Sequence, residues 1–586
     1  MKLYARLLLN CMVKYGIMCS IFVVVLNTQR ERSVVMENKR LQQYREVFET
    51  QYTWKEGYMR NVYRYGDKKA LSFPETNDSW TYSELNTEVN KLSNAMLEDG
   101  VKHGDVVMYL LQNCPVFVFA YVASHKIGAI NAPMNYRLSA GEVALNIDES
   151  KPEVLIYEVE YQALVQEALA MVNHRPKRII LVDVEKKAAA PEGVVTYEDY
   201  VKNCKEDEPQ IDFVPNIYDE TTRLFTSGTT GKQKSVPLTS INEVLSAHDI
   251  IMHFPLNQMD ITMNTTPWFH RGGIHCAGPT PTLYAGGHIV ALRKFDAKTS
   301  LLLVEKYGIT YMVGVPTVLE SLTKEQEASG FDLSSLKGIV TMGSPLERAA
   351  CIRYQSVLTP NIYNGYGTTE TLWNTFLRPF DLPDNAGTAG GSCLDDDVRV
   401  VKTYPDRRGE YNEEVAMDNK EVGEVIIKSP AKAAYCYFNN DEETQRKFHN
   451  GYYYTNDLAT WDKNKYVTIV GRKDDMIISS GENIYPTQVE EVLNSHEKVA
   501  ECIVTSVPDK MRGELVTAYV VKADESLTYE ELEEFCKNSP MIANYKRPRY
   551  YRFIAQIPLN ATGKKLHYKI KEIAREDLIN GLLYRA

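Results

Sequence analysis

Hydrophobic residues in the first half of the chain follow two recurring spacings. Leu85, Val89, Leu92 and Met96 stand three or four positions apart, the spacing of one face of an α-helix. Residues 106–111 form a continuous apolar run, typical of a parallel strand covered on both faces. Strands that alternate with helices predict an α/β architecture with parallel sheets. The helices predicted in this way are 82–97, 116–127, 300–307 and 318–329, and the further strands are 154–157, 179–182, 288–292, 311–315 and 338–342.

The pattern changes in the last third of the chain. After about residue 378, short alternating segments such as 424–427 stand among Gly, Asp and Asn, which predicts a small β-rich unit. From residue 471 on, a segment of about 115 residues is close to the usual size of a domain. It mixes predicted strands with predicted helices, the strands at 500–504 and 516–521 and the helices at 487–494 and 528–537. We therefore divide the chain into an extension at 1–35, a large portion at 36–470 and an α+β domain at 471–586.

Composition and charge exclude several classes of protein. The 586 residues are 44% hydrophobic and 24% charged, as in globular proteins and unlike disordered or collagen-like ones. The formal net charge of −11 argues against a nucleic-acid binder, which needs a basic surface. The ten cysteines contain no CxxC pair and the eleven histidines no HExxH motif, so a zinc hydrolase has no support. Buried free thiols in a reducing, cytoplasmic compartment are the expectation.

Residues 1–35 differ from the rest of the chain. Lys2, Arg6 and Lys14 precede an apolar run at 17–26, which is too short to cross a bilayer because a spanning helix needs about 20 apolar residues. Three explanations stay open: a start assigned upstream of a true beginning at Met36, a weak membrane association, or an export signal without a small-residue cleavage pattern. Membrane contact is expected only through this segment.

The densest chemical signal lies at residues 226–234, whose sequence is Thr-Ser-Gly-Thr-Thr-Gly-Lys-Gln-Lys. Its two glycines permit tight turns in which several main-chain N–H groups point into one hollow. The hydroxyls and lysines add donors and positive charge, so the segment predicts a polyphosphate-binding loop, with a polar surface turn as the alternative. It is not a Walker loop, which has four residues between its glycines. The residues expected to bind phosphate are Thr226, Ser227, Gly228, Thr229, Thr230, Gly231 and Lys234.

A second segment, Asn-Gly-Tyr-Gly-Thr-Thr-Glu at 364–370, has the groups that a nucleotide needs. Tyr366 offers a flat face for adenine and Thr368 a hydroxyl for a phosphate. Glu370 offers a carboxylate of the kind that Mg²⁺ prefers. Taken alone, the segment is equally compatible with a nucleotide site and with a glycine-bearing turn that carries a helix N-cap.

These and three further segments carry a resemblance to a known family. The loop at 227–234 resembles the signature loop of the acyl-adenylate-forming family, which includes acyl-CoA synthetases, luciferases and peptide-synthetase adenylation domains, although Gln233 stands where the family has Pro. Residues 364–370 resemble its second motif, and Thr455-Asn456-Asp457 its Thr-Gly-Asp motif, with Asn in place of Gly. Residues 471–486 resemble its linker into the C-terminal domain, and 558–566 its last lysine motif. The order of all five agrees with the family over about residues 45–575.

The resemblance implies a fold and roles for residues. The fold is two α/β subdomains and a small β-barrel, which together bind AMP, followed by a mobile C-terminal lid. Asp474 is implied as the hinge of this lid, residues 479–482 as the entry for a thiol, and His275 as structural. The implied catalytic residues are Lys564, which stabilises charge at the α-phosphate, and His270, which positions the carboxylate. The implied nucleotide-binding residues are Gly343, Ser344, Tyr366, Gly367, Thr368, Glu370, Asp457, Arg472, Lys473 and Gly481, of which Glu370 is also the metal ligand.

The resemblance implies a reaction in two steps. A carboxylate attacks the α-phosphate of ATP in the presence of Mg²⁺ and expels pyrophosphate, and a thiol then attacks the acyl-AMP. Coenzyme A is the expected thiol. The alternatives are a stand-alone enzyme that loads an acyl carrier protein, a luciferase-like oxygenase and a nucleotide-binding regulator. Trp373, Asn374 and Phe376 suggest either a mixed pocket for medium-length fatty or aryl acids, as in fatty acid metabolism, or an apolar core, and the oligomeric state is not indicated.

Overall fold

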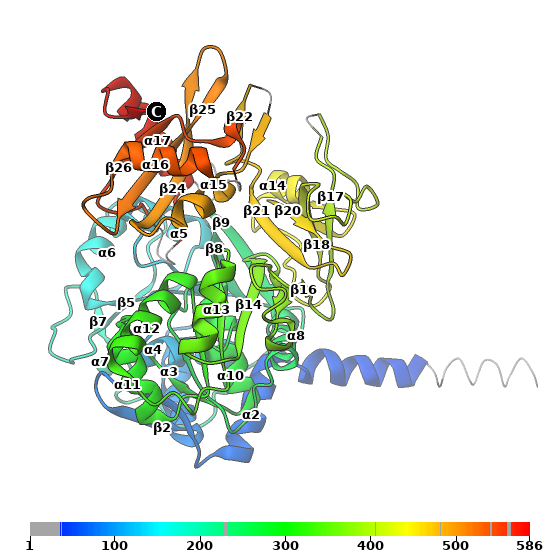
Figure 1. Ribbon diagram of the computed structural model, residues 1–586. Coiled ribbons are helices and arrows are strands. Elements are labelled where there is room, and N and C mark those ends of the chain that lie inside the picture. Colours follow the sequence, from blue (N-terminus) through cyan, green and yellow to red (C-terminus); the bar gives the residue numbers. More distant parts are fainter. Residues whose placement is uncertain are drawn as a thin grey trace, which may run out of the picture.

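The computed structural model describes residues 36, 38–226, 233–404, 406–480, 482–539, 542–559 and 564–586. The extension at 1–35, Ser227 to Gly231 of the phosphate loop, and Gly481 lie outside these residues, so their predictions stay untested. The described chain forms four sheets with helices packed on them (Figure 1). No helix in this part of the chain is both long enough and apolar enough to cross a membrane.

The first sheet has seven strands in the order β7-β6-β5-β3-β4-β8-β9. Its strands are β3 (Val106–Leu110), β4 (Ile130–Pro133), β5 (Val154–Glu158), β6 (Arg178–Val182), β7 (Val195–Thr196), β8 (Glu220–Thr226) and β9 (Lys234–Thr239). All neighbours are parallel except β8 and β9, which form a hairpin. The helices of this region are α3 (Tyr82–Glu98), α4 (Pro115–Ile127), α5 (Ala140–Ser150), η1 (Val159–Tyr161), α6 (Gln162–Leu169) and α7 (Tyr197–Val201).

The second sheet has nine strands in the order β16-β15-β14-β13-β12-β10-β11-β1-β2. Its strands are β1 (Lys69–Phe73), β2 (Asp78–Thr81), β10 (Ile261–Asn264), β11 (His288–Val290), β12 (Tyr311–Gly314), β13 (Gly338–Met342), β14 (Ile362–Thr368), β15 (Leu372–Leu377) and β16 (Gly391–Ser392). The helices that accompany it are α2 (Trp54–Tyr65), α8 (Ser240–His253), α9 (Arg271–His275), α10 (Pro279–Ala285), α11 (Ala297–Tyr307), α12 (Pro316–Ser329), α13 (Arg348–Val357) and η2 (Pro379–Asp381).

The third sheet is antiparallel and curled, and its strand order has open ends, so it is a half-barrel. It comprises β17 (Asp397–Val401), β18 (Gly423–Lys428), β19 (Phe448–His449), β20 (Tyr452–Trp461) and β21 (Val467–Arg472), with α14 (Asp441–Lys447) beside it. The fourth, C-terminal sheet comprises β22 (Ile477–Ser479), β23 (Glu482–Ile484), β24 (Val499–Asp509), β25 (Gly513–Lys522), β26 (Tyr550–Phe553) and β27 (Tyr584–Arg585), with α15 (Pro486–Asn494), α16 (Tyr529–Asn538), η3 (Asn544–Lys546) and α17 (His567–Ile579).

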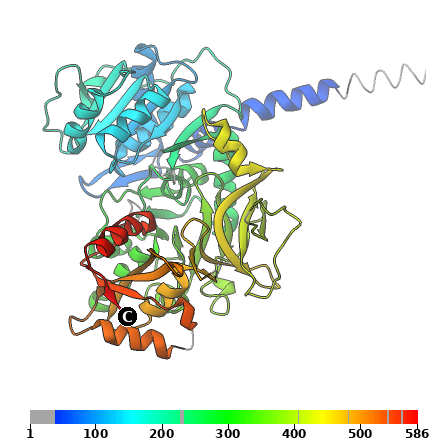
Figure 2. The same cartoon turned by 90° about the horizontal axis from the view of Figure 1, so that it is seen from above.

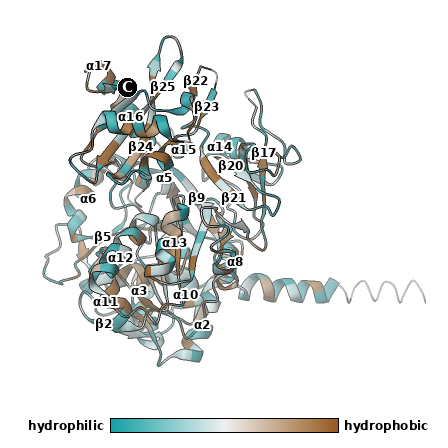
Figure 3. Ribbon diagram, in the orientation of Figure 1, coloured by the Kyte–Doolittle hydropathy of each residue, from teal (hydrophilic) through white to brown (hydrophobic). Residues whose placement is uncertain are grey.

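The nine-stranded sheet lies between the other three sheets (Figure 2). Seen from above, the cyan seven-stranded region, the yellow half-barrel and the orange-to-red C-terminal region lie around the largely green nine-stranded sheet (Figure 2). The boundary that we predict at residue 471 falls at the end of β21, and β22 already belongs to the C-terminal sheet. Brown, hydrophobic residues lie within β20 and β24, whereas the peripheral loops are mostly teal (Figure 3). The chain thus has the predicted α/β class, and its C-terminal part is an α+β unit with a sheet of its own.

Each helix and strand predicted from the hydrophobic pattern is present, with ends that differ by a few residues. Local sequence explains where two of these helices begin and where one of them ends. Thr81 caps α3 and Glu84 returns a hydrogen bond to the cap, which satisfies two main-chain donors. Pro115 opens α4, where a missing N–H is harmless, and Gly128 ends it in the left-handed region.

The cysteine prediction is confirmed for most of the described residues. All eight described cysteines are free, and six are buried. Cys436 is exposed and Cys204 only partly buried, so these two differ from the expectation of buried thiols. Cys436 lies in the segment between β18 and α14, at the surface of the half-barrel region.

Candidate active site

Several predicted motifs follow the carboxyl ends of parallel strands. In the nine-stranded sheet, β10, β12, β13 and β14 are parallel neighbours, so their carboxyl ends lie along one edge. His270 follows β10, Gly343 follows β13, and Glu370 follows β14. Open α/β sheets bind their ligands at this edge. The topology therefore gathers motifs that are distant in sequence.

Strands β8 and β9 flank the segment that is predicted to bind phosphate. Thr226 and Lys234 are opposite each other in their register. The Lys234 ammonium forms an ion pair with Glu443 of α14 and lies 5.5 Å from the centre of the Tyr437 ring. Lys234 thereby points toward the half-barrel region, at the junction of the first and third sheets. Gln233, the departure from the family's Pro, accepts a hydrogen bond from Asn146 Nδ2 at 2.8 Å.

Two predicted nucleotide-binding residues contact each other across the second and third sheets. The Tyr366 hydroxyl donates to Asp457 Oδ2 at 2.8 Å. Burial and then the charge of Asp457 raise the pKa of Tyr366 well above its ordinary value, so the phenol keeps its proton. Arg472 pairs with Asp457 in the register of β20 and β21, with Nη1 3.8 Å from Oδ1. Burial acts to lower the pKa of Arg472, but the charges of Asp457 and Asp475 outweigh it and raise that pKa.

Glu370 is buried and its position is determined by the segment before α14. The Tyr437 hydroxyl donates to Glu370 Oε1 at 2.5 Å, and Ala434 N–H donates to the Glu370 carbonyl at 2.9 Å. Thr368, two residues earlier, shares a hydrogen bond of 3.1 Å with Thr371. Gly367 has no room for a side chain, since a Cβ there would lie 1.6 Å from the Leu372 carbonyl oxygen. The loop that carries Glu370 is therefore tightly folded.

Lys564 reaches this site from the C-terminal part. The residue retains solvent-exposed surface, yet its ammonium is desolvated enough to lower its pKa, against the attraction of Asp457 and Glu370. Burial and the charge of Lys564 lower the pKa of His270 to about 3. His270 is accordingly a neutral imidazole at physiological pH, and its buried Nε2 has no hydrogen-bond partner among the described residues.

The predicted hinge lies against the Asp457 loop. Asn456, where the family has Gly, adopts a left-handed φ of 64°, a conformation that Asn tolerates better than most residues. Its side chain donates to Asp474 Oδ2 at 3.3 Å, and its carbonyl accepts from Lys473 N–H at 2.8 Å. Lys473 Nζ lies 3.4 Å from Glu424 Oε2, and Glu424 Oε1 accepts from Asn456 N–H. The predicted hinge is thus held by contacts to the loop that carries Asp457.

The structure also places the predicted residues Gly343, Ser344 and His275. Gly343 has a φ of 85°, so the turn after β13 requires its conformational freedom, and Ser344 beside it is half-buried. His275 lies buried in α9 with Nε2 against Glu243 Oε2, which agrees with the structural role implied for it.

The residues considered for an acid pocket are fully enclosed. Trp373 Nε1 donates to Asp249 Oδ2 at 2.5 Å, and Asn374 bonds Thr371 and Asp396. Phe376 has no exposed surface. The polar atoms of the first two are bound within the protein, which favours the core explanation over a pocket.

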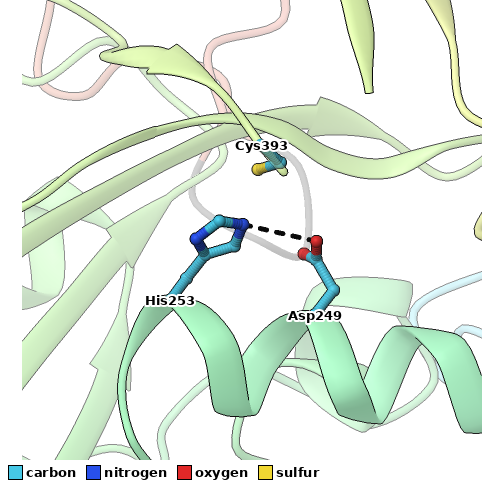
Figure 4. Close-up of side chains that lie close together, drawn as sticks. All are labelled: Asp249, His253 and Cys393. Carbon is cyan, nitrogen blue, oxygen red and sulfur yellow. Dashed lines mark ion pairs between the residues drawn. The ribbon is translucent and has the colours of Figure 1, made fainter. Parts of the chain in front are cut away.

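Asp249 also belongs to a buried cluster with His253 and Cys393 (Figure 4). Their ligand-type atoms lie within 4.8 Å of one another, with His253 Nε2 3.3 Å from Asp249 Oδ1. Two cationic side chains already bind members of this cluster. Lys432 Nζ lies 3.0 Å from Asp249 Oδ2, and Arg378 Nη2 lies 2.9 Å from His253 Nδ1. Arginine can only donate, so Nδ1 accepts and Nε2 carries the proton that a metal would displace. The arrangement fits a structural ion network better than a metal site.

Sequence patterns missed several residues of the site. Tyr437, Glu443, Glu424 and Arg271 each contact a predicted residue or its loop. Asn440 with Glu443 has the spacing of a helix cap and its third residue, and this pattern predicts the start of a helix. It does not predict that Glu443 faces Lys234, which depends on how the half-barrel packs against β9.

Comparisons with known proteins agree with this geometry. A model of the AMP-binding enzyme family matches residues 58–438, and one of the AMP-binding enzyme C-terminal domain matches residues 488–564. An indoleacetate–CoA ligase of Aromatoleum aromaticum is 31% identical over 503 residues, which cover 85% of this chain and 93% of that protein. A fatty acid–[acyl-carrier-protein] ligase, ScoC, of Streptomyces coeruleorubidus is 30% identical over 505 residues, which cover 84% of this chain and 91% of that protein.

A solved structure extends the likeness to the fold. The o-succinylbenzoate coenzyme A synthetase (MenE) of Bacillus subtilis, in complex with ATP and magnesium ion, has a TM-score of 0.74 and 25% identity, covering 88% of this chain and 98% of that one. The sheets, the curled half-barrel and the C-terminal α+β unit therefore recur in a relative. With a family model that spans residues 58–438 and relatives that match along most of their length, this chain belongs to the AMP-binding enzyme family of adenylate-forming acid–thiol ligases.

Proposed function

We propose that this protein activates a carboxylic acid with ATP as an acyl-AMP and then transfers the acyl group to coenzyme A. The observation that carries the proposal is the position of Lys564. Lys564 belongs to the C-terminal part, and the negative charges of Asp457 and Glu370 attract its ammonium. Asp457 belongs to the half-barrel, and Glu370 follows β14 of the nine-stranded sheet. A cation at that place can stabilise negative charge that develops between a carboxylate and the α-phosphate.

The nucleotide is assigned to the groups around Tyr366. We assign the ribose hydroxyls to Asp457, with Arg472 beside them, and the phosphates to the loop after Thr226 together with Lys234 and Thr368. Gly343, Ser344, Gly367 and Lys473 are assigned to the surrounding wall, and Ser227 to Gly231 and Gly481 keep the roles implied by the resemblance. Support comes from the Tyr366–Asp457 hydrogen bond and from the register of Asp457 with Arg472.

Glu370 is the residue that would hold a magnesium ion. Its buried carboxylate is a hard oxygen ligand of the type that Mg²⁺ requires, so the residues present fit a magnesium–nucleotide complex. A bound Mg²⁺ would neutralise phosphate charge during attack and departure of pyrophosphate. Glu370 itself is held by Tyr437, whose hydroxyl directs one carboxylate oxygen.

His270 is proposed to orient the carboxylate of the acid. With a pKa of about 3 it is uncharged, and a carboxylate that is already ionised needs no base. Its buried Nε2, without a protein partner in the described chain, can serve as a polar contact for the substrate. Rotation of the C-terminal part about Asp474 would then withdraw Lys564 and admit the thiol between residues 479 and 482.

The acceptor is proposed to be coenzyme A, as in the indoleacetate–CoA ligase. The second candidate is an acyl carrier protein, because ScoC, whose name states this acceptor, is nearly as similar. The acid is proposed to be an aryl acid, as in the indoleacetate–CoA ligase, or a medium-length fatty acid, in a pocket that does not include the enclosed Trp373, Asn374 and Phe376.

The test has two stages. Pyrophosphate exchange with ATP and Mg²⁺ is measured across a panel of aryl, short, medium and long acids, with an acid-free control. The best acid is then supplied with coenzyme A or with a phosphopantetheinylated carrier protein, and AMP and thioester are quantified. Exchange with no acid of the panel would overturn adenylation, and thioester formed only on the carrier protein would overturn coenzyme A.

A further inference from the structure

Arg271 is a buried cation whose described hydrogen bonds all go to neutral main-chain carbonyls. The residue follows His270 at the start of α9 and is only 2% exposed. Its guanidinium donates through Nη1 to the Thr369 carbonyl and through Nη2 to the Lys432 carbonyl, each at 2.6 Å. None of the described carboxylates lies within ion-pair distance of it, although the charges of the buried Glu243, Glu370 and Asp396 act on it from farther away. Its Nε has no hydrogen-bond partner in the described chain. Burial lowers its pKa to about 10, so it remains charged.

Such an arrangement is a poor source of stability. Burying a charge requires several hydrogen bonds to compensate for lost hydration, and here only neutral carbonyls supply them. A guanidinium is nevertheless suited to one task, since its planar fork fixes two acceptors relative to each other. The identity of the two acceptors therefore indicates what Arg271 does.

Both carbonyls belong to segments that position Glu370. Thr369 is the residue before Glu370. Lys432 opens the segment whose Ala434 N–H bonds the Glu370 carbonyl and whose Tyr437 hydroxyl bonds Glu370 Oε1. One fork thus ties the loop that carries Glu370 to the segment that orients its carboxylate.

The main chain adds a third connection. Arg271 directly follows His270, so the same side chain anchors the segment assigned to the acid substrate. We infer that Arg271 is a positioning residue that sets the Glu370 carboxylate, and with it the metal–nucleotide complex, in register with His270. The inference rests on the proposed function, since it takes Glu370 as the metal ligand.

The test measures metal binding rather than turnover. Binding of Mn²⁺ in the presence of ATP is followed by electron paramagnetic resonance in the wild-type protein, Arg271→Met and Arg271→Lys. We expect Arg271→Met to weaken Mn²⁺ binding about tenfold, as loss of a group that orients a metal ligand commonly does. Arg271→Lys retains the charge but cannot span both carbonyls, so it should recover little of the loss. Wild-type binding in both variants would overturn the inference.

Two controls separate positioning from folding. Lys126→Met removes another fully buried cation, held by Asn86, Asn90 and Glu208 at 2.6–2.7 Å and away from Glu370, and it should lose thermal stability without losing Mn²⁺ affinity. Tyr437→Phe acts on the same carboxylate, so its effect and that of Arg271→Met should be non-additive. Additive effects, or failure of both Arg271 variants to fold, would show a general structural role and contradict the inference. If the wild-type protein binds no Mn²⁺–ATP, the proposed function fails instead.

Discussion

Tyr366 and Asp457, 91 residues apart in the chain, are joined by a hydrogen bond of 2.8 Å from the phenol to Oδ2. The bond links the end of β14 in the nine-stranded sheet to β20 in the half-barrel. In the proposed function, this ring and this carboxylate form one wall of the nucleoside site. The relative positions of two sheets, rather than any local segment, create it.

Removing this hydrogen bond should weaken nucleotide binding. Tyr366→Phe retains the ring and loses the donor, and a hydrogen bond to a charged group contributes about 1.5 kcal/mol. We expect the KM for ATP in pyrophosphate exchange to rise about tenfold, with the KM for coenzyme A unchanged. Tyr363→Phe is the matched control, because its hydroxyl, on the same strand, has no described hydrogen-bond partner. An unchanged KM for ATP in Tyr366→Phe would show that the Asp457 position does not depend on this bond.

Lys564→Ala should separate the two half-reactions. Loss of a group that stabilises developing charge typically slows a step by about 10²–10³-fold, so adenylate formation should fall by that factor. Thioester formation from supplied acyl-AMP should be nearly unchanged, as measured by single-turnover chromatography. Lys565→Ala is the control, because its ammonium bonds Glu490 and the Cys502 carbonyl within the C-terminal part. Equal losses in both half-reactions of Lys564→Ala would contradict the assigned role.

Asp474→Pro should impair the second step more than the first. Proline fixes φ at the predicted hinge, while the described Asp474 N–H forms no main-chain hydrogen bond that would be lost. Adenylate formation should change little, and thioester formation should slow at least tenfold, a factor that corresponds to about 1.4 kcal/mol. Asp474→Ala loses the contact to Asn456 but retains backbone freedom, so it should preserve the ratio of the two rates. A ratio in Asp474→Pro equal to that of the wild type would refute the hinge.

Stability should fall as the pH is lowered below 6.5. Burial is the largest cause that lowers the pKa of His125 and His288 to about 4 and of His270 to about 3. Unfolded histidine binds a proton near pH 6.5, so between about pH 6.5 and 4 the unfolded state holds more protons and is favoured. Each histidine then lowers the free energy of unfolding by up to about 1.4 kcal/mol per pH unit. Above pH 6.5 these three contribute no pH dependence.

Urea unfolding at pH 7, 6 and 5 checks this slope. His125→Phe, which removes one of the three titrating groups, should show a shallower decline than the wild type. His567 does not interfere in this range: burial opposes it, but Glu490 raises its pKa, so its contribution is complete below pH 6.5 and is lost only as the pH rises. A wild-type stability that is constant from pH 7 to 5 would be incompatible with neutral buried histidines.

Much of the fold was accessible from local patterns. The run at 106–111 became the fully buried strand β3, and the apolar spacing from Leu85 to Met96 became α3. Both patterns work because a helix and a strand expose different periodic faces to the core. The half-barrel was predicted as a small β-rich unit, but its openness depends on pairings between distant strands, which no local pattern contains.

The site divides in the same way. Sequence alone determined which residue types are present and in what order. A dense run of Gly, Ser, Thr and Lys, or an Asp after Thr and Asn, carries the same hydrogen-bonding and charged groups in any fold. Only the tertiary structure decided that Glu370 is held by Tyr437, that Lys234 meets Glu443 and that Arg271 joins two carbonyls near Glu370. Those contacts connect separate sheets, and they follow from how the sheets pack, because packing depends on the whole hydrophobic core rather than on neighbours along the chain.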